Sequence, residues 1–163
     1  MAATVEPRLV TSPEFDLVPV RRRDLRRLRR HGPPPGVELP ARHADEGDPR
    51  YPSRRRFRYG LSIAIDVVMH LFWAFLTIGI LLEDPDRPDL VIFLGGFAAY
   101  FAVSFVHRVL VQRAAHATLG KALTGLRMIR DDTGGPPTLR MLAQYWLYSL
   151  GRAVLSVLLT PPV

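Results

Sequence analysis

Residues 61–82 read LSIAIDVVMHLFWAFLTIGILL, and this stretch decides the fold. Its only ionisable side chains are Asp66 and His70. An α-helix of this length measures about 33 Å, which is enough to cross a hydrocarbon core of about 30 Å with some tilt. A buried helix of a soluble protein is rarely apolar over so many residues. We therefore predict a transmembrane helix over residues 61–82.

The carboxylate of Asp66 makes this helix more than an anchor. A carboxylate in lipid costs at least about 2.5 kcal/mol, so it normally faces protein or a water-filled cavity. Residues four apart stack on one side of a helix, which places Arg58, Ser62 and His70 with Asp66, and Thr77 close to that side. We expect this polar side to face protein or water. The Asp66/His70 pair favours a hydrogen-bonded packing pair over a cation site.

A second apolar run predicts a transmembrane helix over 90–108, after an acidic, proline-containing turn at 83–89. Small residues recur along this run at helical spacing, and such residues let two helix backbones approach closely. We expect the second helix to pack through four of them: Gly95, Ala98, Ala99 and Ala102.

A third apolar run covers 141–159 and contains Gln144 and Arg152. Aromatic residues near its start are typical of a membrane interface. The run predicts either a third transmembrane helix, which we prefer, or an amphipathic helix in the interface. If it spans, Arg152 is a candidate partner of Asp66, or else its side chain extends to the outer headgroups. The predicted fold is all-α, a polytopic membrane bundle of about three transmembrane helices.

Residues 1–56 predict a disordered, basic tail rich in Arg and Pro, because they contain too little apolar sequence to offset the entropy of ordering. The basic run 21–30 is either solvated or in contact with anionic lipid headgroups or an acidic partner, as a short helix in which Leu25 and Leu28 share a face. No recognition fold accompanies this charge, so we expect no nucleic acid as partner. The chain thus divides into a tail, 1–56, and a membrane domain, 57–160.

The distribution of basic residues predicts the orientation. Fourteen arginines precede the first predicted helix, the turn 83–89 contains one, and the segment 107–140 contains six basic residues. Loops rich in Lys and Arg stay on the cytoplasmic side. We therefore expect a multi-pass protein whose N-terminus and segment 107–140 are both cytoplasmic.

The segment 107–140 carries no recognisable catalytic pattern. The string LGKA at 119–122 lacks the spacing and the Ser or Thr of a phosphate-binding loop. Glycines indicate a short helix, a turn, an extended stretch LRMIR at 126–130 and a tight turn after it. Cysteine is absent, and no histidine or serine has the spacing of a metal site or a catalytic triad. We expect no enzyme activity, no metal and no cofactor.

Two strings resemble the RDD family of small bacterial integral membrane proteins. They are FRYGLSIAID at 57–66 and TLGKALTGLRMIRDDTGG at 118–135, and the resemblance covers about 58–160. It implies that Asp66 is the family's first aspartate, that Asp131 or Asp132 is the second, and that Arg58 or Arg56 is its arginine. The residues of the second string that match the family pattern are Gly120, Lys121, Gly125, Arg127, Asp131 and Asp132.

The resemblance implies a bacterial cytoplasmic (inner) membrane protein, and transport is the activity suggested for the family. Three helices are too few to enclose a water-lined path. We therefore expect an accessory or stabilising subunit of a transport complex, such as a lipid or other ABC-type transporter, with other membrane proteins or further copies as partners. The alternatives are a homo-oligomeric ion- or proton-coupled carrier that uses Asp66 and His70, and a lipid-modifying membrane enzyme, for which a catalytic set is missing.

Overall fold

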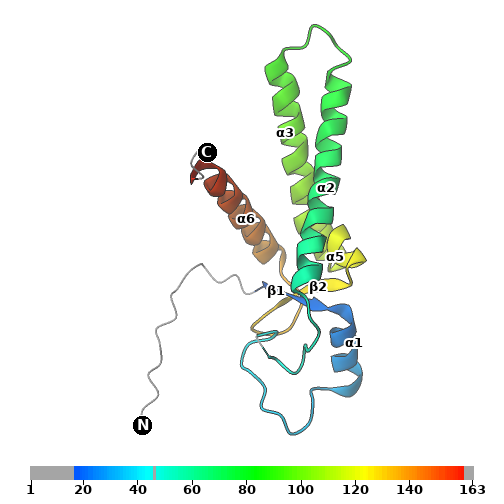
Figure 1. The fold of residues 1–163 in the computed structure, drawn as a ribbon, viewed down its shortest axis with the longest axis vertical. Helices are drawn as coiled ribbons and strands as arrows, with labels where there is room; N and C mark the ends of the chain where they lie inside the picture. Colours follow the sequence, from blue (N-terminus) through cyan, green and yellow to red (C-terminus); the bar gives the residue numbers. More distant parts are fainter. Residues whose placement is uncertain (1–16, 46, 160–163) are drawn as a thin grey trace.

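The computed structural model describes residues 17–45 and 47–159, with side chains up to Gly151. Two long helices form a hairpin, and a two-stranded sheet, two short helices and a further long helix lie at its base (Figure 1). The hairpin consists of α2 (Arg56–Leu81) and α3 (Asp89–Phe105), and α3 continues through a π-helix, η1 (Val106–Val111), into α4 (Gln112–Ala115). The other elements are β1 (Leu17–Arg21), α1 (Arg22–His31), α5 (Leu119–Leu123), β2 (Leu126–Arg130) and α6 (Leu139–Leu159).

The hairpin has the properties of a membrane-embedded structure. Both α2 and the continuous helix Asp89–Ala115 are long and apolar enough to cross a membrane. They expose large apolar side chains, including Phe72, Phe75 and Phe93. Soluble proteins rarely expose so large an apolar surface, whereas lipid solvates it without cost. Helices that could span a membrane are therefore present at the first two predicted positions, and the first begins at Arg56 instead of Leu61.

The two hairpin helices pack through glycines of α3. A Cβ atom added at Gly95 would lie 2.4 Å from Leu81 Cδ1, and one added at Gly96 would lie 2.5 Å from Ile78 Cγ1. The predicted close approach at Gly95 is therefore correct, and Gly96 has to be added to it. Ala99 is half-buried.

The other two predicted packing residues, Ala98 and Ala102, are exposed, so the prediction was wrong for them. They lie one helical turn apart on a side of α3 that α2 does not cover. Small residues at helical spacing occur on more than one side of this helix, so their spacing alone could not select the packed side.

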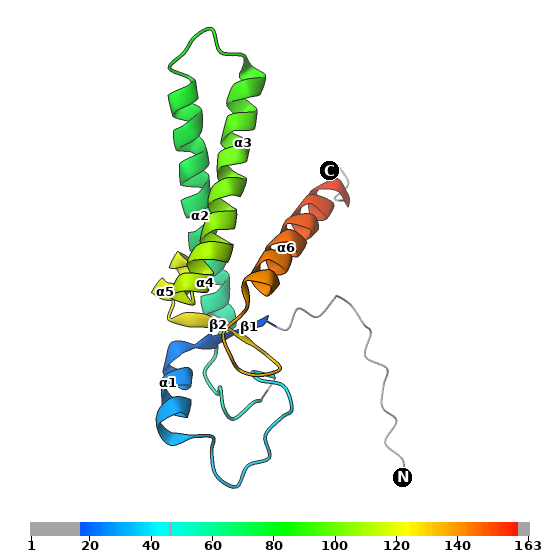
Figure 2. The same ribbon diagram turned by 180° about the vertical axis from the view of Figure 1, so that it is seen from behind.

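Helix α6 diverges from the hairpin in both views (Figures 1 and 2). Its first turns are attached to the base of the molecule: Leu142 is buried against Val109, Met128 and Leu17. Higher up, Trp146 Nε1 donates a hydrogen bond of 3.1 Å to Ser104 Oγ. Among the described residues, two helices pass the test of length and apolarity for a span, and α6 is not one of them. A third span therefore stays a prediction.

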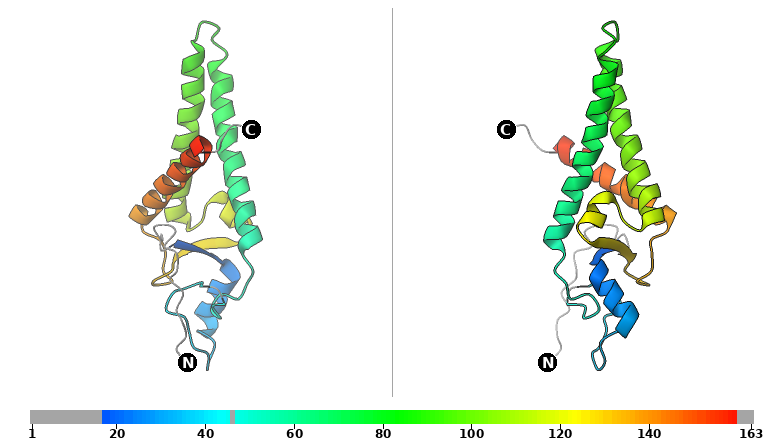
Figure 3. Two further views of the ribbon diagram at one scale, coloured as in Figure 1. Left: turned by 60° about the vertical axis from the view of Figure 1, so that its left-hand side comes forward. Right: turned by 90° about the vertical axis from the view of Figure 1, so that its right-hand side faces the viewer.

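The sheet joins the N-terminal region to the segment that follows the hairpin. Strands β1 and β2 are antiparallel, with Leu17 opposite Arg130 and Arg21 opposite Leu126. One face of the sheet buries Leu17 and Met128 beneath η1 and α6. The other face buries Val20 and Ile129, and Leu25 and Leu28 of α1 pack there together with Ala44 and Tyr51. Helix α1 thus lies across the sheet from the hairpin (Figure 3).

These elements correct the prediction of a disordered tail over 1–56. Within the described residues, 17–45 and 47–56 form a strand, a helix and a loop with buried side chains, and residues 1–16 lie outside the described residues. The short helix predicted around Leu25 and Leu28 is α1. The N-terminal sequence alone does not predict this ordered structure, because β1 pairs with β2, which begins at Leu126. The apolar residues that pack with β1 are therefore far away in the sequence.

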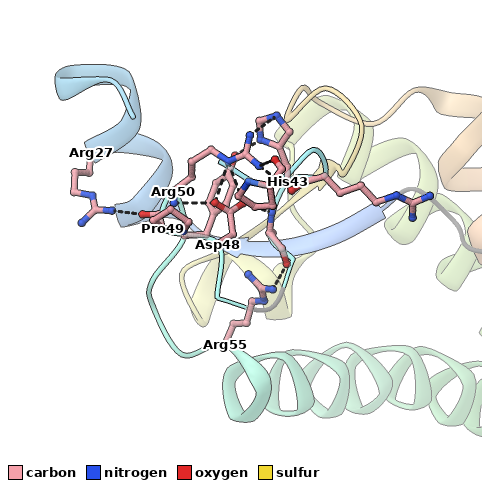
Figure 4. A network of polar contacts seen from close by, with 10 residues as sticks. Arg27, His43, Asp48, Pro49, Arg50 and Arg55 are labelled. Carbon is pink, nitrogen blue, oxygen red and sulfur yellow. Dashed lines mark hydrogen bonds and ion pairs between the residues drawn. The ribbon is translucent and has the colours of Figure 1, made fainter. Parts of the chain in front are cut away.

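A buried ion pair holds the loop between α1 and α2 (Figure 4). Arg50 Nε donates to Asp48 Oδ1 at 3.0 Å, and Arg50 Nη2 donates to the carbonyl oxygens of Pro40 and Arg42, both at 2.7 Å. Burial by itself raises the pKa of Asp48, but hydrogen bonds from Arg50 and from the Ala44 N–H outweigh this effect and hold that pKa below its usual value. The loop is therefore ordered by its polar contacts as well as by Tyr51.

We expect Val20→Asp to release the N-terminal region from the sheet. Val20 has no exposed surface, and a carboxylate in its place cannot keep the apolar packing against Ala44, Tyr51 and Ile129, even with Arg127 opposite it in the sheet. Brief trypsin treatment should then cut within α1 and trim the chain to a fragment that begins near Arg54, while the parent protein resists such trimming. Val37→Asp is the matched control, because Val37 is 49% exposed. Equal trimming of both variants would contradict the packing described here.

Candidate functional site

The polar side of α2 that the sequence predicts is the side that the fold buries. Ser62, Asp66 and His70 are each at most 1% exposed, and Ala74 continues the row. The lower part of this row faces α5, which lies against the lower half of α2 (Figure 1), and His70 contacts His107 of η1. The polar side of the first span therefore faces protein, and its carboxylate lies in the interior of the molecule.

Asp66 is held by the segment that leads into α5. Thr118 Oγ1 donates a hydrogen bond of 2.7 Å to Asp66 Oδ2, and the backbone N–H of Gly120 donates one of 2.8 Å to Oδ1. Both carboxylate oxygens thus have a strong donor, and hydrogen bonds to a charged acceptor are the stronger kind. His107 Nδ1 lies 3.9 Å from Oδ1.

We predict a cationic or hydrogen-bonding partner for Asp66 on the Arg58/His70 face of α2, or Arg152. The hydrogen-bond donors do approach on that face, but they come from the segment before α5. Arg58 Nη1 donates to the Thr124 carbonyl at 3.3 Å, His70 Nε2 lies 3.2 Å from His107 Nδ1, and Arg152 lies outside the described side chains. A helix pattern shows which side of α2 is polar, but it does not show which distant backbone covers that side.

Gly120 allows α5 to approach α2 closely. A Cβ atom at this position would lie 2.1 Å from the Ser62 carbonyl oxygen and 2.9 Å from Asp66 Oδ1. Thr118, two residues earlier, is the N-cap of α5 and accepts a hydrogen bond from the Lys121 N–H at 3.3 Å. The string Thr-Leu-Gly-Lys therefore starts a helix and fastens that helix to Asp66 at the same time.

Two histidines extend the buried polar contacts. His107 Nε2 accepts a hydrogen bond from the Leu119 N–H at 2.8 Å, so a neutral His107 ring carries its proton on Nδ1. That Nδ1–H then donates a hydrogen bond to His70 Nε2, 3.2 Å away. In this arrangement His70 Nδ1 carries an N–H, and it is buried without a hydrogen-bond partner among the described residues.

Lys121 completes the set on the side of α5. Its Nζ donates to Gln112 Oε1 at 3.0 Å and to Thr118 Oγ1 at 3.4 Å. Burial lowers the pKa of Lys121 to about 8, against a partial opposing effect of Asp66. We call the following residues the Asp66 cluster: Asp66, His70, His107, Gln112, Thr118 and Lys121.

The lowered pKa of Lys121 predicts a rise of stability at alkaline pH. Between pH 8 and 10.5 the unfolded chain binds a proton at this side chain that the folded chain has released, so the free energy of unfolding increases with pH in this window. A shift of this size corresponds to an increase of about 3 kcal/mol. Lys121→Met should lack this increase. The measurement is the unfolding temperature of the parent protein and of Lys121→Met at pH 7.5 and at pH 10. If the unfolding temperatures of the two proteins change with pH in parallel, the lowered pKa of Lys121 is contradicted.

The remaining motif residues lie outside the Asp66 cluster. Gly125, with φ of +72°, forms the left-handed turn between α5 and β2, and Arg127 lies on the face of β2 that α1 covers. Asp131 is buried, and Arg42 Nη1 donates to its Oδ2 at 3.3 Å. Asp132 is exposed and accepts from Arg130 Nε at 2.9 Å. Of the two rivals for the second aspartate, Asp131 is the buried one, and it ties the segment after β2 to the N-terminal loop.

Three members of the Asp66 cluster were missed at the level of sequence: Thr118, His107 and Gln112. Thr118 could have been found, because Thr directly before a short predicted helix is a typical N-cap. The other two lie in or directly after η1, on a different helix from Asp66, and spacing along one helix does not show which residues of another helix it contacts. Within the described ranges, no group of three His, Cys, Asp or Glu side chains is arranged to hold a metal ion.

Comparison with known proteins gives one match. The model of the RDD family matches residues 61–160, which is more than half of the chain. This range includes α2 from Leu61 onward, α3, the whole Asp66 cluster and α6, and it omits β1, α1 and the first five residues of α2. No curated protein and no solved structure matches the chain.

Proposed function

Because the chain belongs to the RDD family and contains two helices of membrane-spanning length, we propose that it is an accessory or stabilising subunit of a bacterial inner-membrane transport complex. The main support for this proposal is the burial and the hydrogen bonding of the Asp66 carboxylate. Its side chain is almost completely buried, and Thr118 and Gly120 occupy both of its oxygens. A carboxylate bound in this way stabilises the fold, whereas a transport site must exchange its ion with water.

The arrangement of the helices supports the same proposal. The hairpin exposes apolar and aromatic side chains along most of its length, and α6 diverges from it (Figure 2). With α6 as a third span, as we propose, the chain offers one helix pair and one separate helix to a bilayer. Such an arrangement suits a protein that packs beside larger membrane proteins, and it leaves no enclosed path of its own.

The second candidate is a homo-oligomeric ion- or proton-coupled carrier. It is favoured by the chain of hydrogen bonds that runs from Lys121 through Thr118 to Asp66, with His107 and His70 beside it. Buried titratable groups in contact are the usual parts of a proton relay. Transport by this route requires that segment 118–124 separate from α2 and admit water to Asp66.

Gentle purification and separate reconstitution distinguish the two functions. We expect the tagged protein, extracted from its own cells in mild detergent, to co-purify in a fixed ratio with a larger transport protein. The same protein alone in liposomes should move neither protons nor alkali cations. A homogeneous homo-oligomer whose ion flux is lost in Asp66→Asn would overturn the subunit proposal in favour of the carrier. Ser62→Ala serves as the control variant, since the Ser62 hydroxyl donates to the Tyr59 carbonyl of its own helix and, among the described residues, makes no hydrogen bond with Asp66.

The orientation is part of the proposal and has its own test. We propose that the N-terminus and segment 107–140 are cytoplasmic and that the turn 83–89 is outside. The chain has no cysteine, so the single substitutions Asp86→Cys and Thr133→Cys report on two exposed positions. In intact cells an impermeant thiol reagent should label the first variant and spare the second. The reverse pattern would invert the orientation.

A further inference from the structure

Four arginines meet at the junction of α1 and β2. Arg22, Arg26 and Arg29 of α1, together with Arg127 of β2, line an open pocket of about 310 Å³, and Leu25 is the fifth lining residue. We call this the arginine pocket. Helix α1, which carries three of these arginines, lies on the side of the sheet away from the hairpin (Figures 1 and 3).

The convergence of these arginines is built into the fold. Positions 22, 26 and 29 lie on one side of a helix, because residues three and four apart are neighbours. Arg127 lies opposite Val20 in the sheet, and cross-strand partners point to the same face. Val20 is buried on the face that α1 covers, so Arg127 is directed towards the same helix. Two elements separated by most of the chain thus present their guanidinium groups to one pocket.

Two of these guanidinium groups differ from other arginines of this region in their hydrogen bonds. Within the part of the chain that the structure describes, the Nε atoms of Arg22 and Arg127 are buried without a hydrogen-bond partner. By contrast, Arg23 donates to Ser53, and Arg50 bonds Asp48. Among the residues that the structure describes, no acidic side chain lines the pocket.

The one acid of α1 does not neutralise the pocket. Asp24 accepts a hydrogen bond of 2.6 Å from Ser53 Oγ and is buried there. The arginines therefore repel one another: burial together with the charges of Arg22 and Arg29 lowers the pKa of Arg127. Like charges held this close by a fold are costly unless an anion joins them.

We propose that the arginine pocket is a binding site for a phosphate-bearing anion. Guanidinium groups present planar pairs of N–H donors that match the oxygens of a phosphate, and two or more of them can bind one phosphate at once. The cavity has room for a phosphate group and part of the compound that carries it. The phosphate belongs either to a soluble phosphorylated compound or to the headgroup of an anionic lipid. This site is independent of the Asp66 cluster and of the proposed function.

The first arm of the test uses the full chain in nanodiscs of neutral phosphatidylcholine, with pyrophosphate as the probe and calorimetry as the measurement. If the ligand is soluble, pyrophosphate binds, and Arg26→Gln/Arg29→Gln weakens binding by about tenfold for each arginine removed. The matched control is Arg54→Gln/Arg113→Gln, which removes the same charge from exposed positions that neither line the pocket nor belong to α1. It should weaken binding less than threefold, since a distant exposed charge is screened.

The second arm replaces part of the phosphatidylcholine with phosphatidic acid. If the phosphate comes from a lipid, pyrophosphate does not bind. Phosphatidic acid then slows hydrogen exchange in α1 of the parent protein and of the control variant. It slows this exchange far less in Arg26→Gln/Arg29→Gln. Either result supports the proposal. Failure of both probes, or equal losses in the two double variants, would overturn it. Binding of a single-stranded oligonucleotide without binding of either probe would also overturn it, in favour of nucleic acid.

Discussion

Gly120→Ala should separate α5 from α2 and destabilise the protein by about 3 kcal/mol or more, the upper range for forcing an extra carbon into a packed interior. The added Cβ would lie 2.1 Å from the Ser62 carbonyl oxygen, and this atom belongs to the backbone of a helix. It cannot rotate away as the end of a flexible side chain can. The shift that relieves the overlap lengthens the Gly120 N–H hydrogen bond to Asp66, so the variant loses this bond as well.

The measurement is thermal unfolding in mild detergent, together with hydrogen exchange of residues 118–124. The matched control is Gly60→Ala, because a Cβ at Gly60 of α2 meets no atom within 4 Å. Alanine is the better helix former, so this control should be neutral or slightly more stable. A Gly120→Ala protein as stable as the control would show that α5 does not pack on α2 as described.

Asp66→Leu should have the second large effect, a loss of about 3–5 kcal/mol, which is typical when one partner of a buried charged contact is removed. Leucine leaves the Thr118 hydroxyl and the Gly120 N–H without their acceptor in the protein interior. It also removes the negative charge that favours protonated Lys121. If Asp66 were a costly buried charge without useful partners, the same substitution would increase stability instead.

Two milder variants separate these contributions. Asp66→Asn keeps one carbonyl oxygen as acceptor, so it should cost less than Asp66→Leu. Thr118→Val removes one hydroxyl donor while it keeps the shape of the side chain, and it should cost about 1–3 kcal/mol. The free energy of unfolding of all three variants is measured under one condition. We expect the largest loss of stability for Asp66→Leu and smaller losses for Asp66→Asn and Thr118→Val. Additive effects in the double variant Asp66→Asn/Thr118→Val would contradict direct contact, because residues that share a hydrogen bond couple.

Local pattern was enough to predict the elements of the membrane domain. The hairpin helices follow from apolar runs of sufficient length, and the buried row of Ser62, Asp66 and His70 follows from four-residue spacing. The short helix α5 and the strand LRMIR follow from the positions of Gly120 and Gly125. In each case the information lies within a few turns of helix or one strand, where backbone geometry alone relates sequence to side-chain direction.

The partners of these elements were decided by the tertiary structure. The sequence by itself determined that Asp66 needs a polar environment, because a buried carboxylate is costly in any fold. Only the packing of α5 decided that Thr118 and Gly120 supply it, and only the packing of η1 against α2 placed His107 beside them. The ordered structure of β1 and the position of Arg127 next to α1 likewise depend on the pairing of β1 with β2. These strands are far apart in the chain, so the local sequence pattern does not predict their pairing.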